Sequence, residues 1–325
     1  MMKIRRGTLF QAIISTAILI GLFRLVDLKL LLATLRQVNG LLLTVALLIV
    51  PFAIWIRSVR WQLILNKDDL RVSLREAFLL MNVGAALDMI VPGGAGDLVK
   101  SYYGYKRLGI REEMFSSALI DRFIAFLVLF LLGAFSAFSY HFYLFSAFSL
   151  LSALAISFPL FFPDLVPWRL INRLWVALRG ESLDIERLAH SSCLSSTLLM
   201  TTLLLSFLGW GVTYLQLFIL CLAFQADVDL LYAFLIAPMF SLARLLPFTL
   251  NGLGAQESVI TYLFSLVGLP ATSAILVSFA NRVINYAMPG LIGFWAINTL
   301  TPSLPLEKRE GEGREDKGKD INVSH

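Results

Sequence analysis

The chain has 325 residues, of which 58% are hydrophobic and only 15% charged, and its mean hydropathy is +0.78. Its long apolar runs match the roughly 20 residues that a helix needs to cross a hydrocarbon core about 30 Å thick. Backbone in lipid must satisfy its own hydrogen bonds, which excludes an open sheet. The net charge of +5 is spread over loops, so it indicates membrane orientation and excludes a nucleic-acid-binding patch.

The apolar segments, taken in chain order, define the expected helices. They lie at about 8–23, 38–56, 76–96, 116–139, 141–162, 194–222, 228–268 and 270–299. The first follows Lys3, Arg5 and Arg6 as a signal peptide would, but no small-residue cleavage site follows it, so we expect an uncleaved span. The tail 301–325 is rich in Glu, Lys and Gly, and we expect it to be disordered and cytoplasmic.

The basic loops decide which segments cross the membrane. Residues 57–75, 97–115 and 163–193 are basic and belong on the cytoplasmic side. A crossing at 76–96 would separate the first two, so we expect that segment to enter the membrane and return. The segment 228–268 must then start and finish outside, which predicts a second re-entrant helix pair.

These assignments predict a transmembrane domain at 1–300 that contains two halves with opposite orientations in the membrane. The halves span about 38–139 and 194–299, and the odd crossing at 141–162 reverses the second. The expected fold is an all-α, polytopic helical membrane protein with about six spans plus two re-entrant helix pairs in an inverted-topology repeat. We expect it in the cell (inner) membrane with both termini cytoplasmic. Such repeats commonly meet around a substrate site at the bilayer midplane.

Each re-entrant segment carries a glycine-broken polar motif, and an Arg follows each motif. The motifs supply Pro92, Gly93, Gly94, Gly96 and Asp97 in the first half, and Asn251, Gly252, Gly254, Gln256 and Glu257 in the second. Arg122 and Arg282 lie 160 residues apart, as do Gly133 and Gly293. Gly/Pro-interrupted apolar segments at corresponding places in two halves point to a transport site.

Charged residues inside the predicted membrane segments are the next candidates. The basic ones are Arg122, Arg244 and Arg282, and the candidate acidic partners are Asp88, Asp121 and Glu257. A charge at the bilayer centre costs about 2.5–3.5 kcal/mol on insertion scales, so it normally faces protein or water. Asp121 and Arg122 are also compatible with an interfacial pair, whereas Arg282 lies about midway along its segment.

The two motifs suit an anionic ligand. A helix that starts at or just after Asp97 would direct its first N–H groups at an anion, and the second motif would do the same from the other face. Arg binds phosphate bidentately. The expected substrate-binding residues are Pro92, Gly93, Gly94, Gly96, Asp97, Lys100, Asp121, Arg122, Arg244, Asn251, Gly252, Gly254, Gln256, Glu257, Asn281 and Arg282. The expected partner is a membrane lipid: an anionic or aminoacylated phospholipid, or a polyprenyl-linked intermediate.

No catalytic, metal or cofactor motif is recognised. The sequence has no His-Glu-x-x-His, Gly-x-Ser-x-Gly or Walker A pattern, and Cys193 and Cys221 have no ligand spacing. We therefore expect no enzyme activity, metal or cofactor.

At these motifs the chain resembles the flippase-like membrane family that includes the transmembrane region of lysylphosphatidylglycerol synthase. The resemblance covers about residues 8–300. It rests on Pro92 to Asp97 with Lys100 and Tyr102, on Asp121-Arg122-Phe123, and on Pro247 to Glu257. Asp97 stands where the family usually carries Glu, and Lys100 where it carries Arg, so both charges are kept. The resemblance implies a lipid-translocating fold with re-entrant helices. The soluble aminoacyl-transferring domain of the synthase is not found, so only the lipid-binding or translocating part carries over.

Three hypotheses follow. The leading one is a protein that binds a phospholipid or lipid-linked headgroup and moves it between leaflets. The second is a membrane enzyme acting on a lipid-linked substrate, and the lack of a donor site counts against it. The third is a non-transporting scaffold that recruits a lipid or envelope synthase through the basic loops.

Overall fold

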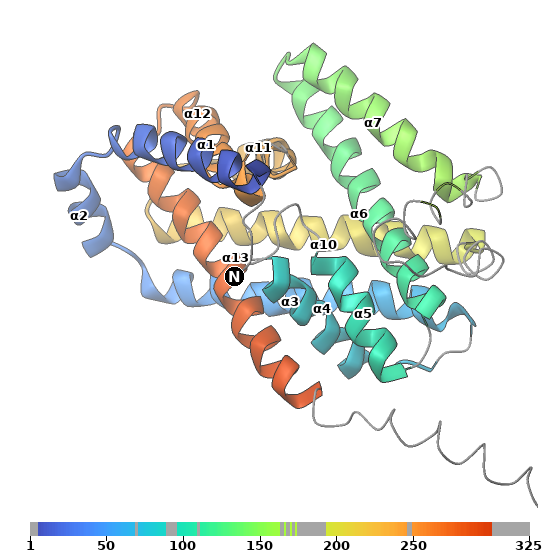
Figure 1. The fold of residues 1–325 in the computed structure, drawn as a ribbon. Coiled ribbons are helices and arrows are strands. Elements are labelled where there is room, and N and C mark those ends of the chain that lie inside the picture. Colours follow the sequence, from blue (N-terminus) through green and yellow to red (C-terminus); the bar gives the residue numbers. More distant parts are fainter. Residues whose placement is uncertain are drawn as a thin grey trace, which may run out of the picture.

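The computed structural model describes residues 6–68, 71–88, 96–108, 111–162, 193–245 and 249–300, with residues 166, 170 and 173. The described residues form helices and no strand, which confirms the all-α prediction (Figure 1). The helices are α1 (Arg6–Phe23), α2 (Leu28–Arg36), α3 (Gly40–Leu65), α4 (Leu74–Asp88), α5 (Gly96–Leu108), α6 (Arg111–Ser139), α7 (Tyr143–Phe161), α10 (Ser196–Ala223), α11 (Leu230–Ala243), α12 (Ala255–Ser265) and α13 (Ala271–Leu300). Short 3₁₀ turns lie at η1 (Asn66–Asp68) and η3 (Leu250–Gly252).

Five of these helices are long and apolar enough to cross a membrane. They are α3, α6, α7, α10 and α13. The apolar part of α1, Phe10–Phe23, is shorter. The chain is therefore a polytopic helical membrane protein, as predicted. The predicted Pro92, Gly93 and Gly94 and the tail 301–325 lie outside the described residues, as do the side chains of Asp88 and Asp97.

Several helices begin at a polar residue that caps the first turn. The side chains of Asn39, Ser195 and Asp229 each accept a hydrogen bond from backbone N–H groups at the start of α3, α10 and α11. Such caps satisfy donors that a helix leaves without an intrahelical partner. These three residues fix where the apolar helices start.

The helix α3 is longer than the sequence predicts. The expected segment ended at residue 56, whereas α3 continues to Leu65. Arg57 and Arg60, which the sequence analysis assigned to a cytoplasmic loop, therefore lie within this helix. The prediction of a loop is wrong for these two residues, because the apolar face of the helix continues through Trp61, Ile64 and Leu65.

Two pairs of short helices lie at the predicted re-entrant segments, except that α5 falls almost wholly within 97–115, which was predicted as a basic cytoplasmic stretch. The first pair, α4 and α5, has 15 and 13 residues, and the second, α11 and α12, has 14 and 11. None reaches the roughly 20 residues that a spanning helix needs. In the second pair, the break between α11 and α12 lies at its glycine motif.

The second break depends on positive φ angles. Asn251, Gly252 and Gly254 have φ angles of 47°, 72° and 85°. A Cβ atom on Gly252 would lie 2.6 Å from the Cα atom of Arg244, so the two chain segments meet where only glycine fits. Gly254 packs against Ser15 and Ile18 of α1, which covers this break.

The helix packing has matching contacts in the two halves. The helices α3 and α10 lie side by side (Figure 1), and the Asn39 N–H donates to the Ala223 carbonyl at 2.8 Å, so they run antiparallel. Around them, α4 packs against α3, α5 and α13, whereas α11 packs against α10, α12 and α6. Each half therefore places its last long helix against a short helix of the other half.

Gly133 and Gly293 lie at these crossed contacts. A Cβ atom on Gly133 in α6 would lie 2.4 Å from Leu242 of α11. One on Gly293 in α13 would lie 2.2 Å from the Asn82 carbonyl oxygen of α4. The two glycines that lie 160 residues apart thus make corresponding close approaches.

Candidate functional site: an arginine-lined cavity between the halves

Two adjoining cavities lie between the halves. The large cavity has a volume of about 600 Å³ and the small cavity about 150 Å³. Both are lined by residues from α3, α4, α10 and α11, and the residues that they share are Ile54, Arg57, Ala85, Trp210, Ser241 and Arg244. The large cavity falls within the roughly 300–1,000 Å³ that ligand pockets commonly enclose. Because they share these six residues, the two cavities are neighbours and form one candidate site.

The charges on this site are strongly unbalanced. Its arginines are Arg57, Arg60, Arg122, Arg244 and Arg282. Among the described lining residues Asp121 is the acidic one, and it lines the large cavity. Among the described residues, Asp121 pairs with Arg60 and Glu257 pairs with Arg282, so the five arginines outnumber the carboxylates beside them. An excess of positive charge attracts anions.

A buried cluster forms one wall of the large cavity. Arg60 Nε donates to Asp121 Oδ1 at 2.8 Å, and Lys100 Nζ lies 3.5 Å from Asp121 Oδ2. Arg60 also donates to the Ser206 hydroxyl of α10 at 2.9 Å. Lys100 is fully buried and lies 4.5 Å from the centre of the Trp61 ring, a cation–π contact. One carboxylate thus joins α3, α5 and α6 through two cations.

A second ionic cluster lies at the break between α11 and α12. Arg282 Nε donates to the Glu257 carboxylate, and its NH2 group donates to the Gly252 carbonyl at 3.0 Å and to Gln256 Oε1 at 3.3 Å. The other Glu257 oxygen accepts from the Gly254 N–H at 2.7 Å. Glu257 is fully buried. Arg282 of α13 therefore ties the positive-φ turn to the rest of the second half.

This arrangement changes the expected role of the second glycine motif. The sequence analysis assigned an anion-binding role to the N–H groups of that break, but the Gly254 N–H is already used by the protein's own Glu257. The carbonyls of Asn251 and Gly252 likewise face Arg282. At the break between α11 and α12, side chains, and not the Gly254 amide, are therefore the groups available to a ligand.

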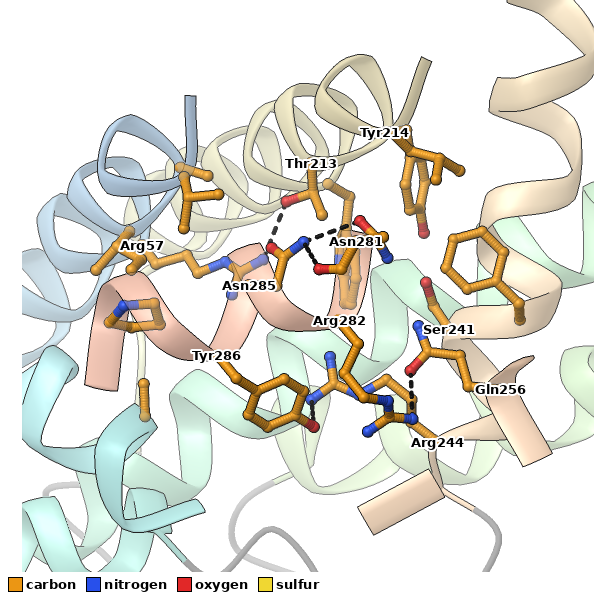
Figure 2. Close-up of a pocket in the computed structure, with 18 residues that line it drawn as sticks. Arg57, Thr213, Tyr214, Ser241, Arg244, Gln256, Asn281, Arg282, Asn285 and Tyr286 are labelled. Carbon is orange, nitrogen blue, oxygen red and sulfur yellow. Dashed lines mark hydrogen bonds between the residues drawn. The ribbon is translucent and has the colours of Figure 1, made fainter. Parts of the chain in front are cut away.

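Aromatic rings hold the remaining cavity arginines. Arg244 donates to the Tyr286 hydroxyl at 3.0 Å, and the guanidiniums of Arg244 and Arg282 lie 5.4 and 5.6 Å from the Tyr286 ring centre (Figure 2). Arg57 donates to the Thr213 hydroxyl at 3.0 Å and lies 5.6 Å from the Trp210 ring centre. These contacts orient the guanidiniums along the shared wall.

The small cavity is also rich in side-chain amides. Asn285 Nδ2 donates to Asn281 Oδ1 at 2.9 Å and to Gln216 Oε1 of α10 at 3.1 Å. Gln256 lines the same cavity from the start of α12 (Figure 2). Amides and arginines from three helices thus converge on one polar space.

The predicted site residues fall into two groups. Those that line the cavities are Asp121, Arg122, Arg244, Asn251, Gln256, Asn281 and Arg282. Lys100, Glu257, Gly252 and Gly254 lie behind them and hold Asp121, Arg282 or the turn in place. Gly96 starts α5 and is not among the lining residues given for either cavity.

The sequence analysis missed several lining residues, above all Arg57 and Arg60. Their spacing of three residues places them on one helix face, and this signal was available once α3 was extended. Tyr286 and Asn285 follow Arg282 by four and three residues, so the same helical spacing would have indicated them. In the described part of the chain, no group of three or more His, Cys, Asp or Glu residues could hold a metal ion.

Comparisons with known proteins agree with this architecture. Two similar chains are UPF0104 membrane proteins of Methanothermobacter thermautotrophicus and Pyrococcus horikoshii. The first is 23% identical over 298 residues, covering 81% of this chain and 86% of the relative. The second is 21% identical over 289 residues, covering 79% of this chain and 86% of the relative. The family model for the lysylphosphatidylglycerol synthase TM region matches residues 9–293. The chain therefore belongs to the lysylphosphatidylglycerol synthase transmembrane-region family.

Proposed function

We propose that this protein binds the anionic headgroup of a phospholipid or lipid-linked intermediate in the cavity between its halves and carries that headgroup between the leaflets. The observation that carries the proposal is the set of five arginines that lines two adjoining cavities among apolar helices. A charge at membrane depth is costly, about 2.5–3.5 kcal/mol on insertion scales, and normally serves a pathway or a site.

The chemistry of the walls favours a phosphate with attached acyl chains. Guanidiniums bind phosphate oxygens through paired hydrogen bonds. The large cavity also has an apolar wall formed by Phe126, Leu129 and Phe130 of α6. A headgroup can therefore contact arginine while its chains stay against apolar surface, which is the division of polarity that a lipid requires.

The transport hypothesis also includes an inverted-topology repeat with two re-entrant helix pairs. Its support is the matching packing of α4 and α11, the lengths of the four short helices, and the close approaches of Gly133 and Gly293. Transporters of this kind move one half against the other around a central site. In the proposed cycle, Arg60 and Arg122 hold the headgroup on one side, and Arg244 and Arg282 hold it on the other.

Arg57 has a special place in this cycle, because it lines both cavities together with Trp210 and Arg244. A headgroup passing between the cavities meets these side chains. We further propose that the protein lies in the cell inner membrane with cytoplasmic termini and acts as a carrier, not an enzyme, with a lipid synthase as its supplier.

Reconstitution of the full chain into vesicles tests the proposal. Vesicles carry fluorescent phosphatidylglycerol, and a membrane-impermeant reductant destroys fluorescence in the outer leaflet only. Wild-type protein is expected to let fluorescence fall below half, because lipid crosses from the inner leaflet. Arg57→Gln is expected to slow that phase at least tenfold, consistent with loss of a charged hydrogen bond of about 1.5–3 kcal/mol.

The matched control is Arg36→Gln, which removes an exposed arginine on α2, remote from both cavities. Equal rates for Arg57→Gln, Arg36→Gln and wild type would remove the cavity from the transport path. Vesicles with wild-type protein that retain half of their fluorescence for every labelled phospholipid would overturn the proposed function itself.

A further inference from the structure

The small cavity contains more hydrogen-bonding groups than a phosphate alone requires. Besides three arginines it is lined by the amides of Gln256, Asn281 and Asn285. Gln256 and Asn281 are 6% and 7% exposed, so these amides are buried in the protein. Buried polar groups normally have hydrogen-bond partners, and their presence here requires an explanation.

The protein uses only part of their capacity. Gln256 Oε1 accepts from Arg282, and Asn281 Oδ1 accepts from Asn285. Among the described residues, the amide nitrogens of Gln256 and Asn281 have no protein acceptor. Behind them, the buried Gln216 Nε2 is also without a partner within the described part of the chain. The amides therefore present N–H donors into the small cavity (Figure 2).

The charges of the small cavity select among headgroups. Arg57, Arg244 and Arg282 line it, and no carboxylate is among its described lining residues. Glu257 pairs with Arg282 behind the wall, which leaves Arg57 and Arg244 as the lining cations that face no described carboxylate of the cavity. An ammonium group offers only donors and a positive charge, so it would meet other donors and like charges here. A hydroxyl both donates and accepts, as an amide does, so hydroxyls match these walls.

We propose that the small cavity holds the hydroxyl-bearing part of a phosphate headgroup, such as a glycerol, another polyol or a sugar, and rejects headgroups that carry an ammonium. This inference rests on the proposed function and specifies its substrate class. The phosphate contacts the shared arginines Arg57 and Arg244, while the hydroxyls contact Gln256, Asn281 and Asn285. The acyl chains remain along the apolar wall of the large cavity.

The corresponding position in the first half supports a specific role for Asn281. The offset of 160 residues that relates Arg122 to Arg282 also relates Asp121 to Asn281. Asp121 pairs with Arg60 and Lys100 in the first half, whereas Asn281 places a neutral amide at the matching position, and no described lining residue of the small cavity is a carboxylate. The two halves therefore differ at the position that decides whether a cation is tolerated.

Three lipids with identical acyl chains test the inference in the full-length protein. Phosphatidylglycerol carries hydroxyls, phosphatidylethanol has the same charge without them, and phosphatidylethanolamine replaces the hydroxyl with an ammonium. Relative binding is measured by native mass spectrometry of the detergent-solubilised protein, and rates by the vesicle assay. We expect phosphatidylglycerol to exceed phosphatidylethanol by about threefold to tenfold, the size of one neutral hydrogen bond, and phosphatidylethanolamine to be the weakest.

Substitutions then assign the preference to the amides. Asn281→Asp is nearly isosteric and keeps the acceptor for Asn285, and it is expected to lower phosphatidylglycerol binding and raise that of phosphatidylethanolamine. Gln256→Ala is expected to bring phosphatidylglycerol down to the level of phosphatidylethanol. Gln37→Ala removes an exposed amide at the C-cap of α2 that lines neither cavity; this control is expected to leave binding of all three lipids unchanged.

The outcomes separate the two proposals. Binding and transport of no phospholipid would overturn the proposed function. Two results would overturn the inference while headgroup transport stands. One is equal affinity for phosphatidylglycerol and phosphatidylethanol. The other is an affinity for phosphatidylethanolamine that equals the affinity for one of these two lipids. If a variant fails to fold, the comparison of the three lipids on the wild-type protein still decides between these outcomes.

Discussion

The ion pair between Glu257 and Arg282 gives a quantitative test of the structure. Breaking a buried pair by removing one partner costs about 3–5 kcal/mol, because the other charge stays buried. The two truncations are not equivalent here. After Glu257→Ala, Arg282 keeps acceptors at Gly252 and Gln256, whereas after Arg282→Ala the fully buried Glu257 keeps, among the described residues, only the Gly254 N–H as a donor. We therefore expect Arg282→Ala to lie at the upper end of that range and Glu257→Ala at the lower end.

A double-mutant cycle measures the coupling between them. The free energy of unfolding is measured in mixed micelles by titration with sodium dodecyl sulfate, followed by tryptophan fluorescence. The loss in free energy of unfolding for the double alanine variant is expected to be smaller than the sum of the two single losses. The difference should be about 1.5–3 kcal/mol, the size of a charged hydrogen bond. Lys29→Ala, an exposed cation on α2, is the control and is expected to change stability by less than about 0.5 kcal/mol.

The order of the two single variants is as informative as the coupling. Additive effects would show that the pair does not interact. A larger loss from Glu257→Ala than from Arg282→Ala would refute the reasoning from the remaining partners. The double variant is expected to recover stability without transport, because it still lacks the Arg282 guanidinium on the small cavity.

Two further substitutions test other parts of the fold by the same unfolding measurement. Asp121→Asn leaves Arg60 and the fully buried Lys100 without their shared carboxylate. We therefore expect the free energy of unfolding to fall by about 3–5 kcal/mol. A fall of less than about 1 kcal/mol would contradict the buried cluster. Gly252→Ala and Gly268→Ala both place alanine at positive φ, at 72° and 78°, but only Gly252 has backbone within 2.6 Å of the new Cβ atom, whereas Gly268 has nothing within 4 Å. We expect Gly268→Ala to lower the free energy of unfolding by about 1 kcal/mol, and Gly252→Ala to lower it distinctly more. Equal losses of stability would argue against the tight approach at the second break.

The membrane fold could be read from the sequence because it depends on local properties. Length and hydropathy predicted about six spans, and five described helices are long and apolar enough to cross a membrane; the apolar part of α1, predicted as a span at 8–23, is shorter. The second glycine motif marks the break between α11 and α12. The end of α3 could not be placed in this way. Arg57 and Arg60 look like the start of a basic loop, but the buried apolar residues that follow them on α3 continue the helix to Leu65.

The residues of the candidate site were easier to predict than their contacts. Glu257 follows Gly254 by three residues, the spacing of a capping box, and the structure uses it to satisfy that N–H. The sequence analysis instead assigned the amide to a ligand. The contacts of Arg282 with the Gly252 carbonyl, and the shared position of Arg57 between the cavities, depend on tertiary packing across the two halves. No local pattern specifies them.

The most direct test of the central claim is whether a lipid headgroup occupies the arginine-lined cavity. Native mass spectrometry of the purified protein, with the released lipids identified, compares wild type with Arg57→Gln and with the exposed control Arg36→Gln. The account predicts a stoichiometric anionic phospholipid on wild type and on Arg36→Gln, and its loss from Arg57→Gln. The same mixture of bulk lipids on all three proteins would contradict it.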